Sequence, residues 1–230
     1  MAEIIDLKII LIVFLTGILP TLFWLLFWLK IDKRKPEPFG LLTLTFFAGA
    51  LVVFLVLPLE QIVKSLQLGS SEQVAVFAGI EEVAKFLIVG IVALRTHFVD
   101  EPVDYAIYLI TGALGFATAE NVMFMIEPSV QQSISFIIET GTLRFLGASI
   151  LHAMLASVVG IALGFVFYKR KRIRVLFGTI GLGIAIILHT FFNSFIIKYV
   201  QINGLLTLAL LWLSTLIIIA LLEKVRRVNH

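Results

Sequence analysis

Residues 79–86 read GIEEVAKF and place two adjacent carboxylates and one ammonium group inside an apolar stretch of helix length. The surrounding run, residues 73–94, is long enough to cross a bilayer, because a spanning helix needs about 20 predominantly apolar residues. A charged side chain at the centre of a span costs at least about 2.5 kcal/mol on insertion scales. Glu81, Glu82 and Lys85 therefore indicate a functional site inside a membrane helix.

The composition of the whole chain indicates a polytopic membrane protein. Hydrophobic residues make up 60% of its 230 residues and the mean hydropathy is +1.08, which leaves too little polar surface for a water-soluble globule. The net charge is +3, but the basic residues lie at the ends of apolar runs, so nucleic acid is excluded as a partner. Because the chain has no cysteine, disulfides, thiolate nucleophiles and cysteine-ligated metals are excluded as well.

Seven apolar runs have spanning length, and we expect an all-α protein with about seven transmembrane helices. The runs cover residues 7–29, 39–59, 73–94, 104–126, 145–168, 175–197 and 205–222. Residues 131–143 mix isoleucine and phenylalanine with polar residues, so we expect an interfacial or re-entrant helix there. No internal repeat or long linker divides the chain, and we expect residues 1–230 to form a single membrane domain.

The distribution of Lys and Arg predicts the orientation of these helices, because cytoplasmic loops carry an excess of both residues. Most of the 18 basic residues fall at one set of helix ends, namely Lys30, Lys33, Arg34, Lys35, Arg95, Lys169, Arg170, Lys171, Arg172, Arg174, Lys224, Arg226 and Arg227. The opposite ends carry Lys8, Lys64, Arg144 and Lys198. We therefore expect the N-terminus to lie outside the cell and the C-terminus in the cytoplasm.

Four polar residues are predicted to lie at one depth in the membrane. With a rise of about 1.5 Å per residue, Glu81, Glu120, His152 and His189 lie about 9 to 13 Å from the outer ends of their helices. They belong to four different runs, which we expect to be the catalytic helices, residues 73–94, 104–126, 145–168 and 175–197. Polar residues from separate helices at one membrane level are typical of a shared cavity, here in the outer half of the bilayer.

Helical spacing adds neighbours to these four residues, because side chains three or four positions apart share a helix face. Lys85 lies within one turn of both Glu81 and Glu82, and Asn193 lies one turn after His189. Three carboxylates and one ammonium leave the cluster about two charges negative if all are ionised, which a low-dielectric cavity resists. We therefore expect protons or a divalent cation to balance the charge.

Two chemistries fit this set of residues, and both end in peptide hydrolysis. In the first, zinc is bound and another Glu is the general base for a metal-bound water; the candidate ligands are Glu82, Glu120, His152 and His189. In the second there is no metal: Glu81 deprotonates a water that attacks a peptide carbonyl, while His189 and Asn193 stabilise the oxyanion. Lys85 tunes the electrostatics in either case. The spacing alone leaves both chemistries open.

The alternative from another functional class is a proton- or cation-coupled transporter, since buried Glu, His and Lys also build relays and ion sites. The sequence shows no inverted repeat and no paired broken helices, which many transporters have. Asn121 is equally explained as a tie between two helices. Ser149 is discounted as a nucleophile, because small residues are common at helix contacts and no partner pattern follows it.

Four motifs follow one another along the chain, EEVAK at residues 81–85, GFATAEN at 115–121, LHA at 151–153 and LHTFFN at 188–193. This ordered set resembles the motifs of PrsW-type intramembrane proteases, a family distantly similar to the CAAX prenyl endopeptidase and bacteriocin-processing clan. The likeness covers most of the chain, from Glu37 and Pro38 through the run at 175–197.

The resemblance implies a multi-pass endopeptidase of a prokaryotic plasma membrane. Its substrate would be a single-pass membrane protein, such as an anti-sigma factor, cut near the outer membrane face, with membrane lipid as the other partner. The resemblance also implies that Glu81 activates water and that His189 and Asn193 form an oxyanion hole. The chain has Lys85, whereas the wider clan has an arginine one position further along. It has Glu120 at the position where the clan has a histidine. Zinc-dependent and metal-free mechanisms both stay open.

Overall fold

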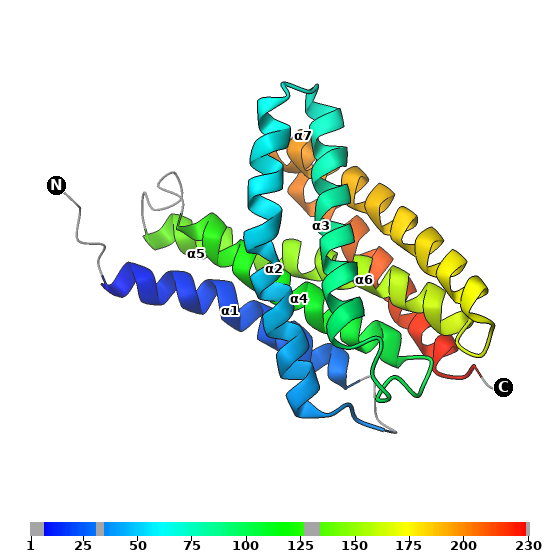
Figure 1. The fold of residues 1–230 in the computed structure, drawn as a ribbon. Helices are drawn as coiled ribbons and strands as arrows, with labels where there is room; N and C mark the ends of the chain where they lie inside the picture. The colour runs from blue at the N-terminus through cyan, green and yellow to red at the C-terminus, as the bar shows by residue number, and fades with distance from the viewer. Residues whose placement is uncertain (1–6, 31–34, 127–133, 229–230) are drawn as a thin grey trace.

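The computed structural model describes residues 7–30, 35–126 and 134–228, and every regular element in these ranges is an α-helix (Figure 1). The helices in chain order are α1 (Leu7–Leu29), α2 (Phe39–Ser65), α3 (Ser70–Val92), α4 (Asp104–Met125), α5 (Ile134–Leu146), α6 (Ala148–Phe165) and α7 (Lys171–Val225). A backbone in lipid must satisfy its hydrogen bonds within its own segment, which favours helices. The predicted all-α fold is confirmed.

Six helical segments of the described chain are long and apolar enough to cross a membrane, namely Leu11–Leu29, Phe39–Ser65, Asp104–Met125, Ile134–Phe165, Lys171–Phe195 and Leu208–Val225. Helix α3 has the length of a span but carries Glu81, Glu82 and Lys85 in its middle. The seven predicted runs overlap these six segments and α3; the polytopic prediction is confirmed, and the number of seven spans stays a prediction. The orientation with the N-terminus outside stays a prediction.

Helix α7 is 55 residues long, far longer than one span needs. Figure 1 shows it bent back on itself, with its orange and red half returning beside its yellow half. Contacts with α6 support this path: Leu163 lies against Gly178 near the start of α7, and the neighbouring Gly164 lies against Val225 at its end. Helix α7 therefore supplies two of the predicted runs.

Helix α5 occupies the described part of the predicted interfacial segment, while residues 131–133 lie outside the described residues. A single residue, Gly147, separates α5 from α6. Ile137 is fully buried in a cluster with Val13 of α1 and Met125 of α4. A helix in this segment is confirmed, and its position at the membrane surface stays a prediction.

Helices α4 and α6 form the centre of the molecule (Figure 1). Helix α4 is buried on nearly all sides and touches α1, α2, α3, α5 and α6. A helix that is apolar all round belongs in a protein core, which is where both helices lie. The polar residues that α4 and α6 carry therefore point into the protein and meet partners there.

Small residues bring α2 and α4 into backbone contact. A Cβ atom on Gly49 of α2 would collide with the backbone of Gly112 of α4, and one on Gly115 would collide with the carbonyl oxygen of Phe46. Glycine at helix contacts permits this close approach in membrane proteins. The contact fixes how α4 is rotated, and Glu120 follows Gly115 on the same helix.

Polar contacts secure the opposite end of α4. The hydroxyl of Tyr108 donates a hydrogen bond to Glu37, which precedes α2. The carboxylate of Asp104 accepts hydrogen bonds from the backbone N–H groups of Asp100 and Glu101, which satisfies two donors of the loop before the helix. These contacts tie the start of α4 to its preceding loop and to the entry of α2.

Candidate active site

One face of α3 carries three charged side chains into the protein. Glu81, Glu82 and Lys85 are 8%, 3% and 4% exposed. Glu81 and Glu82 are adjacent, and Lys85 follows them by four and three residues, so its side chain lies about one helical turn from both. Each would be costly in lipid, so their burial against α4, α6 and α7 is what makes α3 compatible with a membrane position.

The ammonium of Lys85 is the centre of a hydrogen-bonded network. Its Nζ lies 2.5 Å from Oε1 of Glu82 and 3.7 Å from Oε2 of Glu81. It also lies 2.9 Å from Nδ1 of His152 and 4.7 Å from the ring centre of Phe116. Since an ammonium has donors and no acceptor, Nδ1 of His152 accepts this hydrogen bond.

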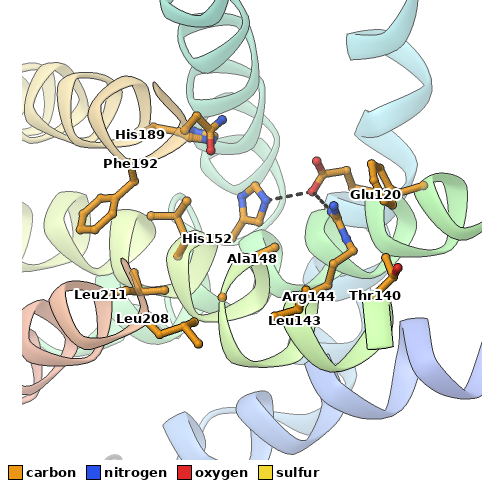
Figure 2. A pocket seen from close by; sticks show the side chains of 14 residues that line it. Glu120, Thr140, Leu143, Arg144, Ala148, His152, His189, Phe192, Leu208 and Leu211 are labelled. Atoms are coloured by element: carbon orange, nitrogen blue, oxygen red, sulfur yellow. Dashed lines mark hydrogen bonds and ion pairs between the residues drawn. The ribbon is translucent and has the colours of Figure 1, made fainter. Parts of the chain in front are cut away.

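The other ring nitrogen of His152 faces α4. Its Nε2 lies 3.0 Å from Oε2 of Glu120, and Nη2 of Arg144 lies 2.9 Å from the same oxygen (Figure 2). With Nδ1 accepting from Lys85, the proton of a neutral His152 resides on Nε2 and is donated to Glu120. Glu120 thus orients His152, and Arg144 of α5 neutralises Glu120.

His189 of α7 closes the network on the side of α3. Its Nδ1 lies 2.8 Å from Oε1 of Glu82, the oxygen that also accepts from Lys85. The rings of His189 and His152 meet edge to face, with centroids 5.5 Å apart. Because the carboxylate of Glu82 accepts the Nδ1 proton, Nε2 of a neutral His189 carries a lone pair.

Glu81 differs from the other two carboxylates of the network. Its Oε2 is buried and makes no hydrogen bond to any described residue. Glu81, Glu82 and His189 each offer a ligand atom within 4.8 Å of the others. Carboxylate oxygen and imidazole nitrogen are ordinary zinc ligands, so this group fits a zinc ion.

The candidate metal-binding group of the structure, Glu81, Glu82 and His189, differs from the candidate ligand set of the sequence. Glu82 and His189 belong to both, and Glu81 joins them. His152 has both ring nitrogens engaged, by Lys85 and by Glu120, and Glu120 is paired with Arg144. These contacts favour orienting roles for Glu120 and His152 over ligation.

A cavity of about 350 Å³ opens beside the network (Figure 2). Its polar lining includes Glu120, Thr140, Arg144, His152, His189 and Asn193. Its apolar lining includes Phe124, Leu143, Leu151, Phe192, Leu208 and Leu211. The volume falls within the range of about 300 to 1,000 Å³ typical of ligand pockets, and the mixture of walls is typical of such sites.

All seven site residues proposed from the sequence meet in this region. Six of them are joined by the contacts above, namely Glu81, Glu82, Lys85, Glu120, His152 and His189. Asn193 lines the cavity with His189, one helical turn away. The four helices predicted to share one depth therefore do bring their polar residues together.

Sequence reasoning missed Arg144, which it placed among the loop charges that set orientation. In the structure Nε of Arg144 donates to Oδ1 of Asn121 at 2.5 Å, and Nδ2 of Asn121 donates to the hydroxyl of Ser149 at 3.2 Å. Asn121 and Ser149 thus brace Arg144 against Glu120. A signal was present: Arg144 stands between two apolar runs with no charged neighbour, unlike the clustered basic residues of the loops.

Arg144 also changes the charge of the site. Glu81, Glu82 and Glu120 face two fixed cations, Lys85 and Arg144, so the negative excess falls from two charges to one when all are ionised. A smaller excess needs less compensation by protons or a metal ion. The remaining negative charge lies at Glu81 and Glu82, which belong to the candidate metal-binding group.

Comparison with known proteins finds one matching family model and several related sequences. A family model described as "PrsW family intramembrane metalloprotease" matches residues 37–222. Protease PrsW of Bacillus subtilis (strain 168) is 27% identical over 177 residues, covering 75% of this chain and 77% of the relative. Protease PrsW of Clostridioides difficile (strain 630) is 30% identical over 190 residues, which cover 78% of this chain and 77% of the relative. No solved structure matches the chain significantly.

Proposed function

The chain belongs to the PrsW family of intramembrane metalloproteases and is an intramembrane protease, and we propose that its active site is the network around Lys85, with Glu81 as general base. The supporting observation is Oε2 of Glu81, a buried carboxylate oxygen with no hydrogen-bond donor among the described residues. A general base needs a lone pair within reach of the proton it removes. In Glu82 and Glu120, by contrast, one carboxylate oxygen accepts hydrogen bonds from two internal partners.

Lys85 divides the two neighbouring carboxylates between two roles. Its Nζ lies 2.5 Å from Oε1 of Glu82 and 3.7 Å from Oε2 of Glu81. Glu81 therefore keeps its lone pairs for a water proton while the ammonium stays close enough to stabilise charge. Glu82, hydrogen-bonded to Lys85 and His189, holds both partners in place.

A zinc ion fits beside Glu81, and Glu82 and His189 would hold it, with Glu81 close enough to complete the set or to take a proton from water. When bound, zinc would supply Lewis acidity and a more acidic water. Nδ1 of His189 lies 2.8 Å from Oε1 of Glu82, so the two ligand side chains already meet, and the ion would take the place of the proton between them. We assign oxyanion stabilisation to the amide of Asn193, which lines the cavity.

His152 is proposed to carry protons on the far side of Lys85. Glu120 accepts from its Nε2, and Arg144, Asn121 and Ser149 hold Glu120 in turn. Such a chain fixes the tautomer of the ring, and a ring with a fixed tautomer presents its proton at one defined atom. The role of Arg144 is positioning, through Glu120.

We propose a single-pass membrane protein, such as an anti-sigma factor, as the substrate. The apolar walls of the cavity, among them Leu151, Phe192 and Leu211, suit the side chains of a membrane-anchored segment next to its scissile bond. The charge bias predicts that the site lies in the outer half of the bilayer, which favours cleavage near the extracytoplasmic face. Membership in a protease family favours this function over the transporter alternative.

The test maps the N-termini of membrane proteins by mass spectrometry in cells that express the wild type, Glu81→Gln or Glu139→Gln. Glu139 is an exposed glutamate of α5, so its variant is the matched control. New termini within or just outside single-pass segments should appear with the wild type and Glu139→Gln and be absent with Glu81→Gln. Identical maps for all three, at equal abundance of folded protein, would contradict the proposed role of Glu81.

A further inference from the structure

A second cavity, of about 720 Å³, lies away from the candidate active site. It is a groove between the C-terminal half of α3 and the start of α7, two helices that pack side by side. Leu87 and Ile91 of α3 and Val175 of α7 line it, and each of these side chains is more than half exposed. The groove therefore opens on the outer surface of the helix bundle, where a membrane protein meets lipid.

Three cations stand at one end of this groove: Arg95 after α3, and Lys171 and Arg174 in the first turn of α7. None of the described residues that line the groove is acidic. Arg95 and Lys171 are exposed and form no salt bridge with any residue that the structure describes. An apolar groove with an unneutralised basic end complements an amphiphile with an anionic head.

Arg174 supplies an independent indication of an anionic ligand. Its Nη1 donates a hydrogen bond to the hydroxyl of Tyr105 at 3.2 Å, which anchors the guanidinium against α4. Its Nε is buried and has no hydrogen-bond partner within the described ranges. A buried donor without an acceptor is unfavourable, so an acceptor at this point would stabilise the site. Phosphate oxygens match the fork of an arginine.

We propose that this groove binds one anionic phospholipid. Arg174, Arg95 and Lys171 hold its phosphate, and an acyl chain lies along Leu87 and Ile91. The groove volume falls in the range of about 300 to 1,000 Å³ that ligand sites occupy. The charge bias predicts that this end of the helices is cytoplasmic, and the cytoplasmic leaflet carries the anionic lipids.

The first test separates this site from general attraction between basic loops and anionic membranes. The purified full-length chain is titrated in detergent with dioleoyl phosphatidylglycerol, and bound lipid is counted by native mass spectrometry. Arg95→Gln with Lys171→Gln should weaken binding about 25-fold, since each cation near a lipid headgroup contributes about fivefold. Both positions are exposed and without salt bridges among the described residues, so the fold tolerates the change.

Lys169→Gln with Arg172→Gln is the matched control, because it removes two exposed cations from the same basic cluster outside the groove. Binding by this variant should equal that of the wild type. Equal weakening in both double variants would overturn the site in favour of a general electrostatic effect. Equal binding of dioleoyl phosphatidylcholine and dioleoyl phosphatidylglycerol would also overturn the proposed lipid site. So would displacement of phosphatidylglycerol by inorganic phosphate at the same concentration.

The second test fills the groove without changing any charge. Gly90 lines the groove, and a Cβ atom built on it meets no atom within 4 Å, so Gly90→Leu places a side chain in open space. Gly183 of α7 has the same open surroundings and lies outside the groove, which makes Gly183→Leu the control. Gly90→Leu should reduce phosphatidylglycerol binding while Gly183→Leu leaves it unchanged. Undiminished binding by Gly90→Leu would contradict a lipid chain in the groove.

Discussion

Nζ of Lys85 lies 2.9 Å from Nδ1 of His152, and this contact joins the carboxylate pair of α3 to the acid of α4. Because the ammonium can only donate, it fixes the position of the proton on His152 at Nε2, opposite Glu120. A single lysine thereby stabilises Glu82, sets the tautomer of His152 and lies near Glu81.

Replacing Lys85 by methionine should both destabilise the protein and abolish cleavage. The change leaves the buried Glu82 without its cation, and breaking a buried ion pair typically costs about 3 to 5 kcal/mol. Thermal unfolding in detergent measures the first effect, and cleavage of a membrane substrate measures the second. Lys64→Met removes an exposed cation and is the control. If Lys85→Met unfolded at the same temperature as the wild type, the central role of this ammonium would be contradicted.

Arg144 and Glu120 should act as one unit in a double-mutant cycle. Their side chains form a salt bridge of 2.9 Å, and groups in direct contact typically show coupling of about 0.5 to 3 kcal/mol. Arg144→Met, Glu120→Gln and the double variant are compared by the rate of substrate cleavage. We expect the double variant to be little worse than the worse single one. Additive losses would show that Arg144 acts on substrate independently of Glu120.

The purified protein should retain about one zinc ion per chain, and His189→Ala should lower this content. His189 offers its ligand atom within 4.8 Å of those of Glu81 and Glu82. Elemental analysis by mass spectrometry measures the metal without reference to activity. His97→Ala, which removes an exposed histidine, is the control. Full cleavage activity in a protein freed of metal by a chelator would instead support the metal-free glutamate mechanism.

Gly115→Ala should destabilise the protein and reduce cleavage together. The added methyl group would collide with the carbonyl oxygen of Phe46, and overpacking of this kind typically costs about 1 to 3 kcal/mol. Separation of α2 from α4 would also shift Glu120, which lies on α4. Gly183→Ala meets open space, and its higher helix propensity predicts a gain of up to about 1 kcal/mol. The midpoints of thermal unfolding distinguish the two variants, and equal midpoints would contradict the close α2–α4 contact.

The predictions from sequence were most successful where one-dimensional regularities apply. The rise along a helix is constant, so counting residues predicts one level for Glu81, Glu120, His152 and His189, and these side chains do lie in one network; their depth in the membrane stays a prediction. Spacing also placed Lys85 beside both acids of α3. Arg144 was misread because charge counting along the chain assigns every terminal cation to a loop, and only tertiary packing shows that α5 turns this one inward.

The members of the candidate metal-binding group could be chosen only from the tertiary structure, for a similar reason. His152 and Glu120 are as suitable by type and depth as His189 and Glu82. Whether a side chain is open to an ion depends on what already occupies its nitrogen or oxygen atoms, and those partners come from other helices. Contacts of His152 with Lys85 and Glu120 depend on the rotation of α6 and α4 about their axes, which no hydrophobic period specifies for a helix buried on all sides.

The sequence by itself determined that this chain is a helical membrane protein with a polar site in four of its helices. Lipid forces the backbone to satisfy its own hydrogen bonds, and buried charges are too costly to be incidental. The tertiary structure alone decided which atoms meet: Lys85 with His152, Arg144 with Glu120, and Glu81 with Glu82 and His189. Hydrogen bonds and metal ligation act over about 2 to 3 Å, and helix rotation and close packing at residues such as Gly115 set distances on that scale.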